Sequence, residues 1–300
     1  MRCRARRTRP TPDAKPRSRS RWLTATDPGR EPEDSVDVPE GRGFGVAAGL
    51  DPDVAAPLAA RCQELGYDSM WSNDHPGALG LETLAAFAAA APELDLGVGV
   101  MALDRHSPAE IAGHLERLGL DRSRLWIGVG AGFDERPLTT MSEAVPRLRE
   151  QLEGVRVVLA AMGPRMSRLA GEAYDGAFFN WMTPAFAERS RLNVEAGAAG
   201  AERRPPPVFG YVRTAVGPDA EDRLAREESF YRDLHDGYRN HFERLDEPEG
   251  TVGIAAADAD AAQRELAAYE RALDVQVVRG LAGARAEPMI ALAEAAAPRR

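Results

Sequence analysis

A carboxylate and an imidazole stand side by side in the stretch "MWSNDHP", residues 70–76. Met70 and Trp71 are typical of a buried strand, and Asp74 and His75 follow at the point where that strand ends. Histidine as a residue type titrates near neutral pH, which makes His75 a candidate general acid or base. The alternatives are a histidine that caps a turn and an aspartate that begins the next helix.

A second candidate for chemistry is the stretch "AAMGPRMSRLAG", residues 160–171. A strand ends at a glycine, Pro164 begins a helix, and Arg165 lies in its first turn. The free amides at a helix start attract a phosphate, which an arginine can also bind. An ordinary strand-to-helix turn with a solvated arginine remains the alternative.

Two more strand ends carry residues that suit a bound ring system. The stretch "GVGVMALDRHSP", residues 97–108, offers bare backbone for the face of a flat ring, or a β-bulge needed only for packing. His106 follows it as a substrate contact or a solvated loop residue. Asn180 and Trp181 end another strand, where they line a pocket or belong to the core.

The elements that must position these residues alternate regularly. Eight short apolar runs predict strands, and amphipathic segments with apolar residues three and four apart separate them. Eight such units in about 250 residues predict a TIM (β/α)8 barrel, an α/β fold whose catalytic groups follow the carboxyl ends of the strands. An open, doubly wound sheet is the alternative. The predicted strands are 44–50, 69–73, 95–103, 125–131, 156–162, 177–182, 208–216 and 274–279.

The predicted helices fill the connections between these strands. The seventh connection, residues 218–273, is long enough to be an insertion with at least two helices, and its segment 221–244 has the charge pattern of a helix with a solvated face. A lid or dimer surface is the alternative for that segment. The other predicted helices are 53–65, 82–91, 107–118, 142–153, 164–174 and 184–198.

Composition narrows the classes further. The chain has 300 residues, 44% hydrophobic content and a net charge of −9. Residues 1–40, first rich in Arg and Pro and then acidic, predict a disordered tail, and residues 41–300 form the predicted domain. The acidity of that domain argues against nucleic acid, and no apolar stretch is long enough for a membrane span. With only Cys3 and Cys62, the cytoplasm is the expected compartment.

Several familiar motifs are absent or misplaced. Gly43, Gly45 and Gly49 lie within the first predicted strand with the wrong spacing for a dinucleotide fingerprint. The only lysine is Lys15, in the tail, so no pocket lysine can form a Schiff base. His235 and His241 are six residues apart and do not share a helix face, so we expect no metal.

Taken in order, four stretches resemble one family. "GYDSMWSNDHP", "LGVGVMALDRHSPAEIAGHLERL", "RLWIGVGAGF" and "AAMGPRMSRLAGEAYDGAFFNWMTP" are similar to the bacterial luciferase-like monooxygenase superfamily, especially its branch using the deazaflavin coenzyme F420. The resemblance covers most of residues 43–217 and the chain end more loosely. It implies a TIM barrel with a late insertion and a flavin or deazaflavin at the carboxyl-end mouth.

Residue by residue, the resemblance implies roles for the strand ends. It places Asp74 near the ring system and His75 next to the reacting centre. It puts a strand-three bulge, often with a non-prolyl cis peptide, on Gly99 and Val100. Its phosphate loop falls on Met162, Gly163, Pro164, Arg165 and Met166. Phe133 stands where some deazaflavin dehydrogenases have a glutamate proton donor, which argues against a sugar-phosphate dehydrogenase.

The expected function is therefore hydride transfer between coenzyme F420 and a small organic substrate. His75 is expected to be catalytic, and Trp181, Asn180 and His106 are expected to contact the substrate. An FMN-dependent monooxygenase using O2, a non-catalytic flavin-binding protein, and a barrel hydrolase using Asp134 or Glu135 with Asp219 remain alternatives. A homodimer is expected because relatives often form one. The substrate cannot be inferred from the sequence.

Overall fold

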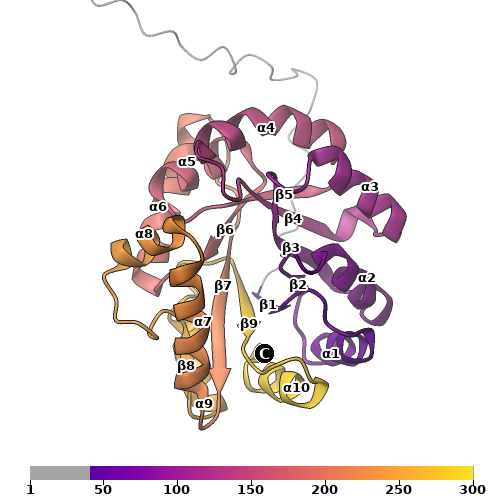
Figure 1. Ribbon diagram of the computed structural model, residues 1–300, viewed down its shortest axis with the longest axis vertical. Coiled ribbons are helices and arrows are strands. Elements are labelled where there is room, and N and C mark those ends of the chain that lie inside the picture. The colour runs from indigo at the N-terminus through magenta and orange to yellow at the C-terminus, as the bar shows by residue number, and fades with distance from the viewer. Residues whose placement is uncertain (1–40, 300) are drawn as a thin grey trace, which may run out of the picture. The chain divides into compact units, whose positions relative to one another are not determined.

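The computed structural model describes residues 41–299. The predicted disordered tail over residues 1–40 lies outside the described residues. Within the described part, parallel strands alternate with helices, and the helices surround the strands (Figure 1). The strands are Gly41–Val46 (β1), Ser69–Ser72 (β2), Asp95–Ala102 (β3), Leu125–Gly130 (β4), Arg156–Ala160 (β5), Gly176–Asn180 (β6), Val208–Val216 (β7), Ile254–Ala256 (β8) and Val275–Gly280 (β9).

Eight of these strands close into a barrel. Each strand from β1 to β7 pairs with the next one along the chain, including β6 with β7. β9 then lies between β7 and β1 and pairs with both, which completes the ring. All of these pairings are parallel. The predicted TIM barrel is therefore confirmed. The first strand begins three residues earlier than predicted and ends at Val46, because Gly49 (φ 77°) turns the chain and Asp51 caps the next helix.

The helices follow the predicted order. Several begin at proline, and Ser107 closes a capping box with Glu110 at the start of its helix. Among the described residues no helix is long and apolar enough to cross a membrane. The helices are Pro52–Glu64 (α1), Gly80–Ala90 (α2), Pro108–Leu118 (α3), Pro137–Gln151 (α4), Pro164–Ala173 (α5), Pro184–Gly200 (α6), Ala220–Leu234 (α7), Asp236–Leu245 (α8), Ala259–Ala267 (α9) and Ala286–Ala295 (α10), with a short 3-10 helix at Arg122–Arg124 (η1).

The predicted insertion is present between β7 and β9. It contains α7, α8, β8 and α9, and β8 pairs with β7 outside the closed ring. Segment 221–244 is not one helix, because the chain breaks at His235, which caps α8 and accepts a hydrogen bond from the Gly237 amide. Its face is not wholly solvated either. Glu228 is fully buried and binds Arg232 and the Val252 amide.

The apolar residues form three clusters. The largest packs the outer faces of the strands against the helices. A second fills the barrel interior with Trp71, Trp126, Phe178, Phe209 and other buried side chains. A third lies under α7 and α8, around the indole of Trp181. The barrel is therefore filled at its base, and only its carboxyl-end mouth is left for chemistry.

Candidate active site at the barrel mouth

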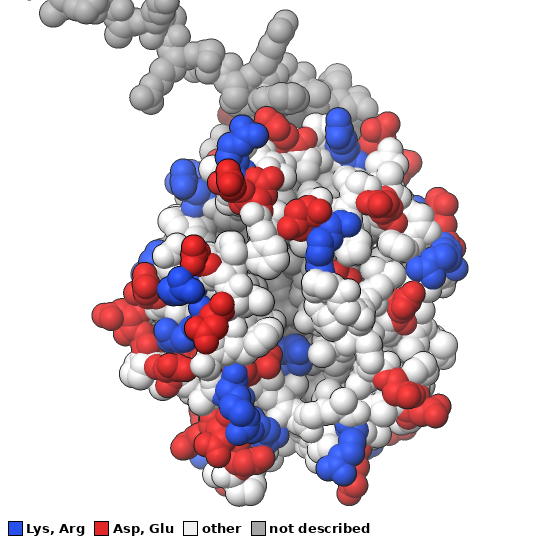
Figure 2. Space-filling view, in the orientation of Figure 1, with Lys and Arg blue, Asp and Glu red and all other residues white. Residues whose placement is uncertain are grey.

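The wall of the mouth is asymmetric. Gly45 of β1 and Gly99 of β3 point inward, since a Cβ on either residue would lie about 3 Å from the Tyr211 ring. On the opposite side, β7 turns the aromatic rings of Phe209 and Tyr211 inward. Figure 2 shows a hollow along the middle of the face that it draws. The absence of a side chain at Gly45 and Gly99 thus lets the Tyr211 ring pack against both strands, and the rings form the floor of the mouth.

The bulge expected on strand three is present. The register between β3 and β4 shifts between Val98 and Met101, and the Gly99–Val100 peptide is cis. Gly99 and Val100 are half-buried in a strand whose neighbouring positions are buried, so this peptide faces the mouth. The Tyr211 hydroxyl donates to the Ser72 carbonyl oxygen at 3.0 Å and fixes the ring beneath the bulge.

Asp74 lies at the centre of a buried hydrogen-bond cluster. Its side chain is 1% exposed and accepts from the Gly80 amide at 2.9 Å and from Arg105 Nη2 at 2.7 Å. His106 Nε2 lies 3.0 Å from the same carboxylate. Because a carboxylate only accepts, the His106 nitrogen that faces it, Nε2, carries a proton. Asp74 therefore joins the loops after β2 and β3, and its predicted contact with the cofactor stays a prediction.

His75 lies on the exposed side of the same turn. Its Nδ1 accepts from the Gly77 amide at 3.1 Å, so the neutral ring carries its proton on Nε2. The backbone of His75 pairs with Ala78 in an isolated bridge that fixes the turn. His75 can therefore present a donor nitrogen to solvent or to a bound molecule, and its catalytic role stays a prediction.

The predicted phosphate loop forms the start of α5. Gly163 precedes the helix, Pro164 is its first residue, and no side chain caps it. A Cβ at Gly163 would meet nothing within 4 Å, which leaves the backbone open to close approach. Arg165 is exposed and makes no hydrogen bond or ion pair within residues 41–299. Met162 and Met166 are half-buried on either side.

A buried histidine holds this loop in place. His241 of α8 lies with Nε2 2.6 Å from the Trp181 carbonyl oxygen and Nδ1 3.1 Å from that of Met162. Burial lowers the pKa of His241, although these carbonyl oxygens act in the opposite direction. A neutral ring can donate to only one of them. His241 thus ties the insertion to the ends of β5 and β6.

The substrate contacts expected on β6 lie near a buried arginine. Asn180 accepts a hydrogen bond from Arg213 Nη1, and its amide nitrogen lies 3.4 Å from the Tyr238 hydroxyl. Trp181 is 1% exposed, and the Arg213 guanidinium stacks on its ring at 4.4 Å. Burial raises the pKa of Tyr238 to about 12, so its phenol stays protonated at neutral pH.

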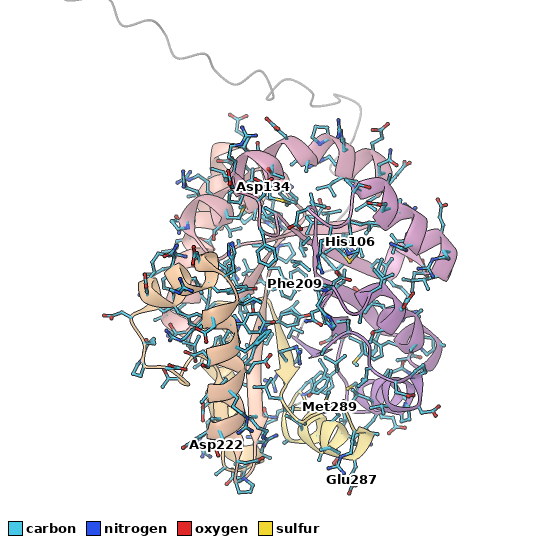
Figure 3. All side chains as sticks on the ribbon, in the orientation of Figure 1. His106, Asp134, Phe209, Asp222, Glu287 and Met289 are labelled. Carbon is cyan, nitrogen blue, oxygen red and sulfur yellow. The ribbon has the colours of Figure 1, made fainter. Side chains whose placement is uncertain are left out.

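Sequence reasoning missed Arg213, Arg279, Tyr211 and His241. A signal for the arginines was available, since a strand that turns Phe209 and Tyr211 inward must also turn Arg213 inward. Two of the three carboxylates of the hydrolase alternative, Asp134 and Asp219, have other partners. Asp134, labelled in Figure 3, is exposed and accepts from the Arg136 amide and from Thr140 at the start of α4. Asp219 pairs with Arg223.

Residues 35–159 and 143–296 match the model of the luciferase-like monooxygenase family. The chain belongs to this family. The curated proteins to which this chain is similar include 5,10-methylenetetrahydromethanopterin reductases. The one from Methanolobus tindarius is 29% identical over 188 residues, which is 51% of this chain and 58% of that protein. The one from Archaeoglobus fulgidus is 28% identical over 174 residues, 46% of this chain and 52% of that protein.

This chain thus spans little more than half the length of the curated relatives it matches. Solved structures share the fold over more of it. An F420-dependent secondary alcohol dehydrogenase holding an F420-acetone adduct has a TM-score of 0.69 and 17% identity, over 86% of this chain and 99% of that chain. The oxygenating constituent of a Pseudomonas putida 3,6-diketocamphane monooxygenase, in complex with FMN, has a TM-score of 0.61 and 14% identity. The match covers 87% of this chain and 97% of that chain.

Proposed function

We propose that this chain is an oxidoreductase that transfers hydride between coenzyme F420 and a small organic substrate bound at the barrel mouth. The observation that carries the proposal is the half-buried Gly99–Val100 bulge at the mouth, where Gly99 packs closely against the Phe178 and Tyr211 rings. Family membership supports it. Solved neighbours that hold F420 or FMN support these two cofactors as the candidates.

The described residues fit such a cofactor. The bulge at Gly99 and Val100 would back the ring, and the uncapped start of α5 with Gly163 and Arg165 would hold a phosphate. When bound, the deazaflavin supplies the hydride donor or acceptor, and the protein supplies orientation and proton traffic.

Proton movement falls to the imidazoles at the mouth. His75 can donate a hydrogen bond from Nε2 to the oxygen of a bound alcohol or carbonyl. It takes up the proton of an alcohol on Nε2 only in the tautomer that carries its own proton on Nδ1, for which the Gly77 amide must release Nδ1. Asp74 fixes the His106 ring through its Nε2 and thereby sets which nitrogen of His106 faces a substrate. The buried rings of Tyr211 and Phe178 exclude water from below the bulge.

Titration of the purified chain with F420 and with FMN, followed by quenching of cofactor fluorescence, tests the proposal. We expect F420 to bind at least tenfold more tightly than FMN. Tighter binding of FMN would favour the monooxygenase that uses O2, and a chain that binds neither would contradict the proposal. If the chain binds a cofactor but shows no turnover with any hydride donor or acceptor, the alternative of a non-catalytic flavin-binding protein would be favoured.

Titration of the Gly163→Ala variant tests whether the loop before α5 takes part in cofactor binding. The added methyl meets nothing within 4 Å and the residue has φ −146°, so the fold should tolerate it. A phosphate approaching the backbone would meet the methyl, and cofactor affinity should fall.

Arg165→Gln should weaken cofactor binding about tenfold, since a charge-assisted hydrogen bond contributes about 1.5 kcal/mol. Arg168→Gln is the matched control, because Arg168 is also exposed on α5 and contacts only the Ala196 carbonyl oxygen at 3.4 Å. Equal affinities for the two arginine variants would place the phosphate elsewhere.

A further inference from the structure

Two buried arginines occupy the barrel mouth opposite the bulge. Arg213 of β7 and Arg279 of β9 are 3% and 6% exposed. Each lies two residues beyond an interior side chain, Tyr211 and Val277, so both turn into the barrel at its carboxyl end. They are directly paired in the sheet register. Figure 2 shows a basic side chain at the floor of the hollow on this face.

Within the described part of the chain, most of the hydrogen-bond donors of the two guanidinium groups have no partner. Arg213 Nη1 donates to Asn180 Oδ1, and Arg279 Nη1 donates to the Gly280 carbonyl oxygen at 3.0 Å. The Nε atoms of both residues are buried and have no hydrogen-bond partner within residues 41–299. The Nε and Nη2 edge of a guanidinium is the fork that binds a carboxylate or phosphate through two parallel hydrogen bonds.

The charge of the pair is not balanced by an ion pair. Among the described residues neither arginine forms an ion pair with a carboxylate, and Glu227 of α7 only raises the pKa of Arg279 from a distance. Burial, and then the charge of Arg213, lower the pKa of Arg279. Two like charges without counter-ions in a buried position are costly to a fold. Such an arrangement is expected where a ligand supplies the missing negative charge.

The surroundings place this pair beside the bulge. The Arg213 guanidinium lies 4.4 Å above the Trp181 ring, 5.1 Å from that of Tyr231 and 5.3 Å from that of Tyr211. Trp181 has φ 53°, an uncommon conformation for a bulky residue, which sets its ring under the guanidinium. Tyr211 also lies against Gly99. A group bound to the arginines would therefore be separated from the bulge only by the Tyr211 ring.

We propose that Arg213 and Arg279 bind the anionic group, a carboxylate or a phosphate, of the substrate. The inference rests on the proposed function and narrows its substrate to small anionic molecules. The bound anion would accept hydrogen bonds from the free guanidinium edges, while the rest of the molecule would extend past Tyr211 towards Gly99 and Val100.

Anion binding to the full chain tests this without any redox reaction. Benzoate and inorganic phosphate serve as probes, titrated at constant ionic strength against chloride and followed by fluorescence of the four tryptophans and by the thermal midpoint. We expect one probe to saturate and to raise the midpoint. A stronger response to benzoate assigns a carboxylate, and a stronger response to phosphate assigns a phosphate. No response to either beyond chloride would overturn the proposal.

Variants separate a binding role from a structural one. In Arg279→Met and Arg213→Gln, affinity for the probe should fall at least tenfold. The midpoint of Arg279→Met without probe should rise, because an unpaired buried charge is removed. Arg239→Gln, at an exposed position on α8, is the control and should bind the probe as the unchanged chain does. A lower midpoint with unchanged probe affinity in both variants would make the arginines structural.

The same variants distinguish failure of this inference from failure of the proposed function. Titration of both with F420 in the absence of anion should give the affinity of the unchanged chain. A loss of F420 binding together with anion binding would assign the arginines to the cofactor and overturn the proposal. Anion binding in a chain that binds neither F420 nor FMN would contradict the proposed function alone.

Discussion

Removal of the Asp74 carboxylate should destabilise the barrel strongly. The carboxylate is buried and accepts from the Gly80 amide, Arg105 and His106 at 2.7–3.0 Å. Loss of one partner from a buried, hydrogen-bonded charge pair costs about 3–5 kcal/mol. Arg105 is 28% exposed, so water replaces part of what it loses. We therefore expect Asp74→Ala to lower the free energy of unfolding by about 2–4 kcal/mol.

Urea denaturation followed by circular dichroism measures this loss. The thermal midpoint should fall by about 4–16 °C, since 1 kcal/mol corresponds to about 2–4 °C in a domain of this size. Asp134→Ala is the matched control, because that carboxylate also accepts two hydrogen bonds but is exposed. Its loss should stay below about 1 kcal/mol. A loss in Asp74→Ala no larger than in Asp134→Ala would refute the description of Asp74 as the link between the two loops.

Other predictions follow from glycine packing and from one buried imidazole. Gly171→Ala should cost about 3 kcal/mol or more by urea denaturation, because the new Cβ would lie 1.9 Å from the Val194 carbonyl oxygen between α5 and α6. Gly113→Ala meets nothing within 4 Å in α3 and should gain about 1 kcal/mol; a loss there would contradict the reasoning. His241 has a lowered pKa in the fold, so its contribution to stability is present above about pH 6.5 and is lost as the pH falls below that value. Between pH 7.5 and 5.5 the unfolding free energy of His241→Gln should therefore fall less than that of the unchanged chain, and equal slopes would contradict this.

The barrel could be predicted from the sequence because the spacing of apolar residues within an element, and the alternation of strands and helices, are visible along the chain itself. Apolar runs of five to nine residues alternated with amphipathic segments, and the chain repeated this pattern eight times. β8 could not be found in this way, since three residues with a single pairing partner carry no periodicity. The break at His235 was missed although Asp236 and Gly237, two weak helix formers, follow it, and the break depends on how the imidazole caps α8.

The site was predictable in its positions but not in its contacts. Family resemblance placed Gly99, Val100 and Gly163 correctly on a bulge and at a helix start. It did not show that the Asp74 carboxylate is saturated by three donors, because two of those come from residues more than 30 positions away. His241 was similarly invisible, since its partners lie 60 and 79 residues distant.

The central claim is that the bulge of β3 and the start of α5 hold one redox cofactor. Diffraction from crystals of the chain soaked with F420 tests it most directly. The account predicts that the tricyclic ring lies against the Gly99–Val100 peptide and the phosphate lies at the amides that follow Gly163. A ring bound outside the barrel mouth, or a phosphate away from α5, would contradict it.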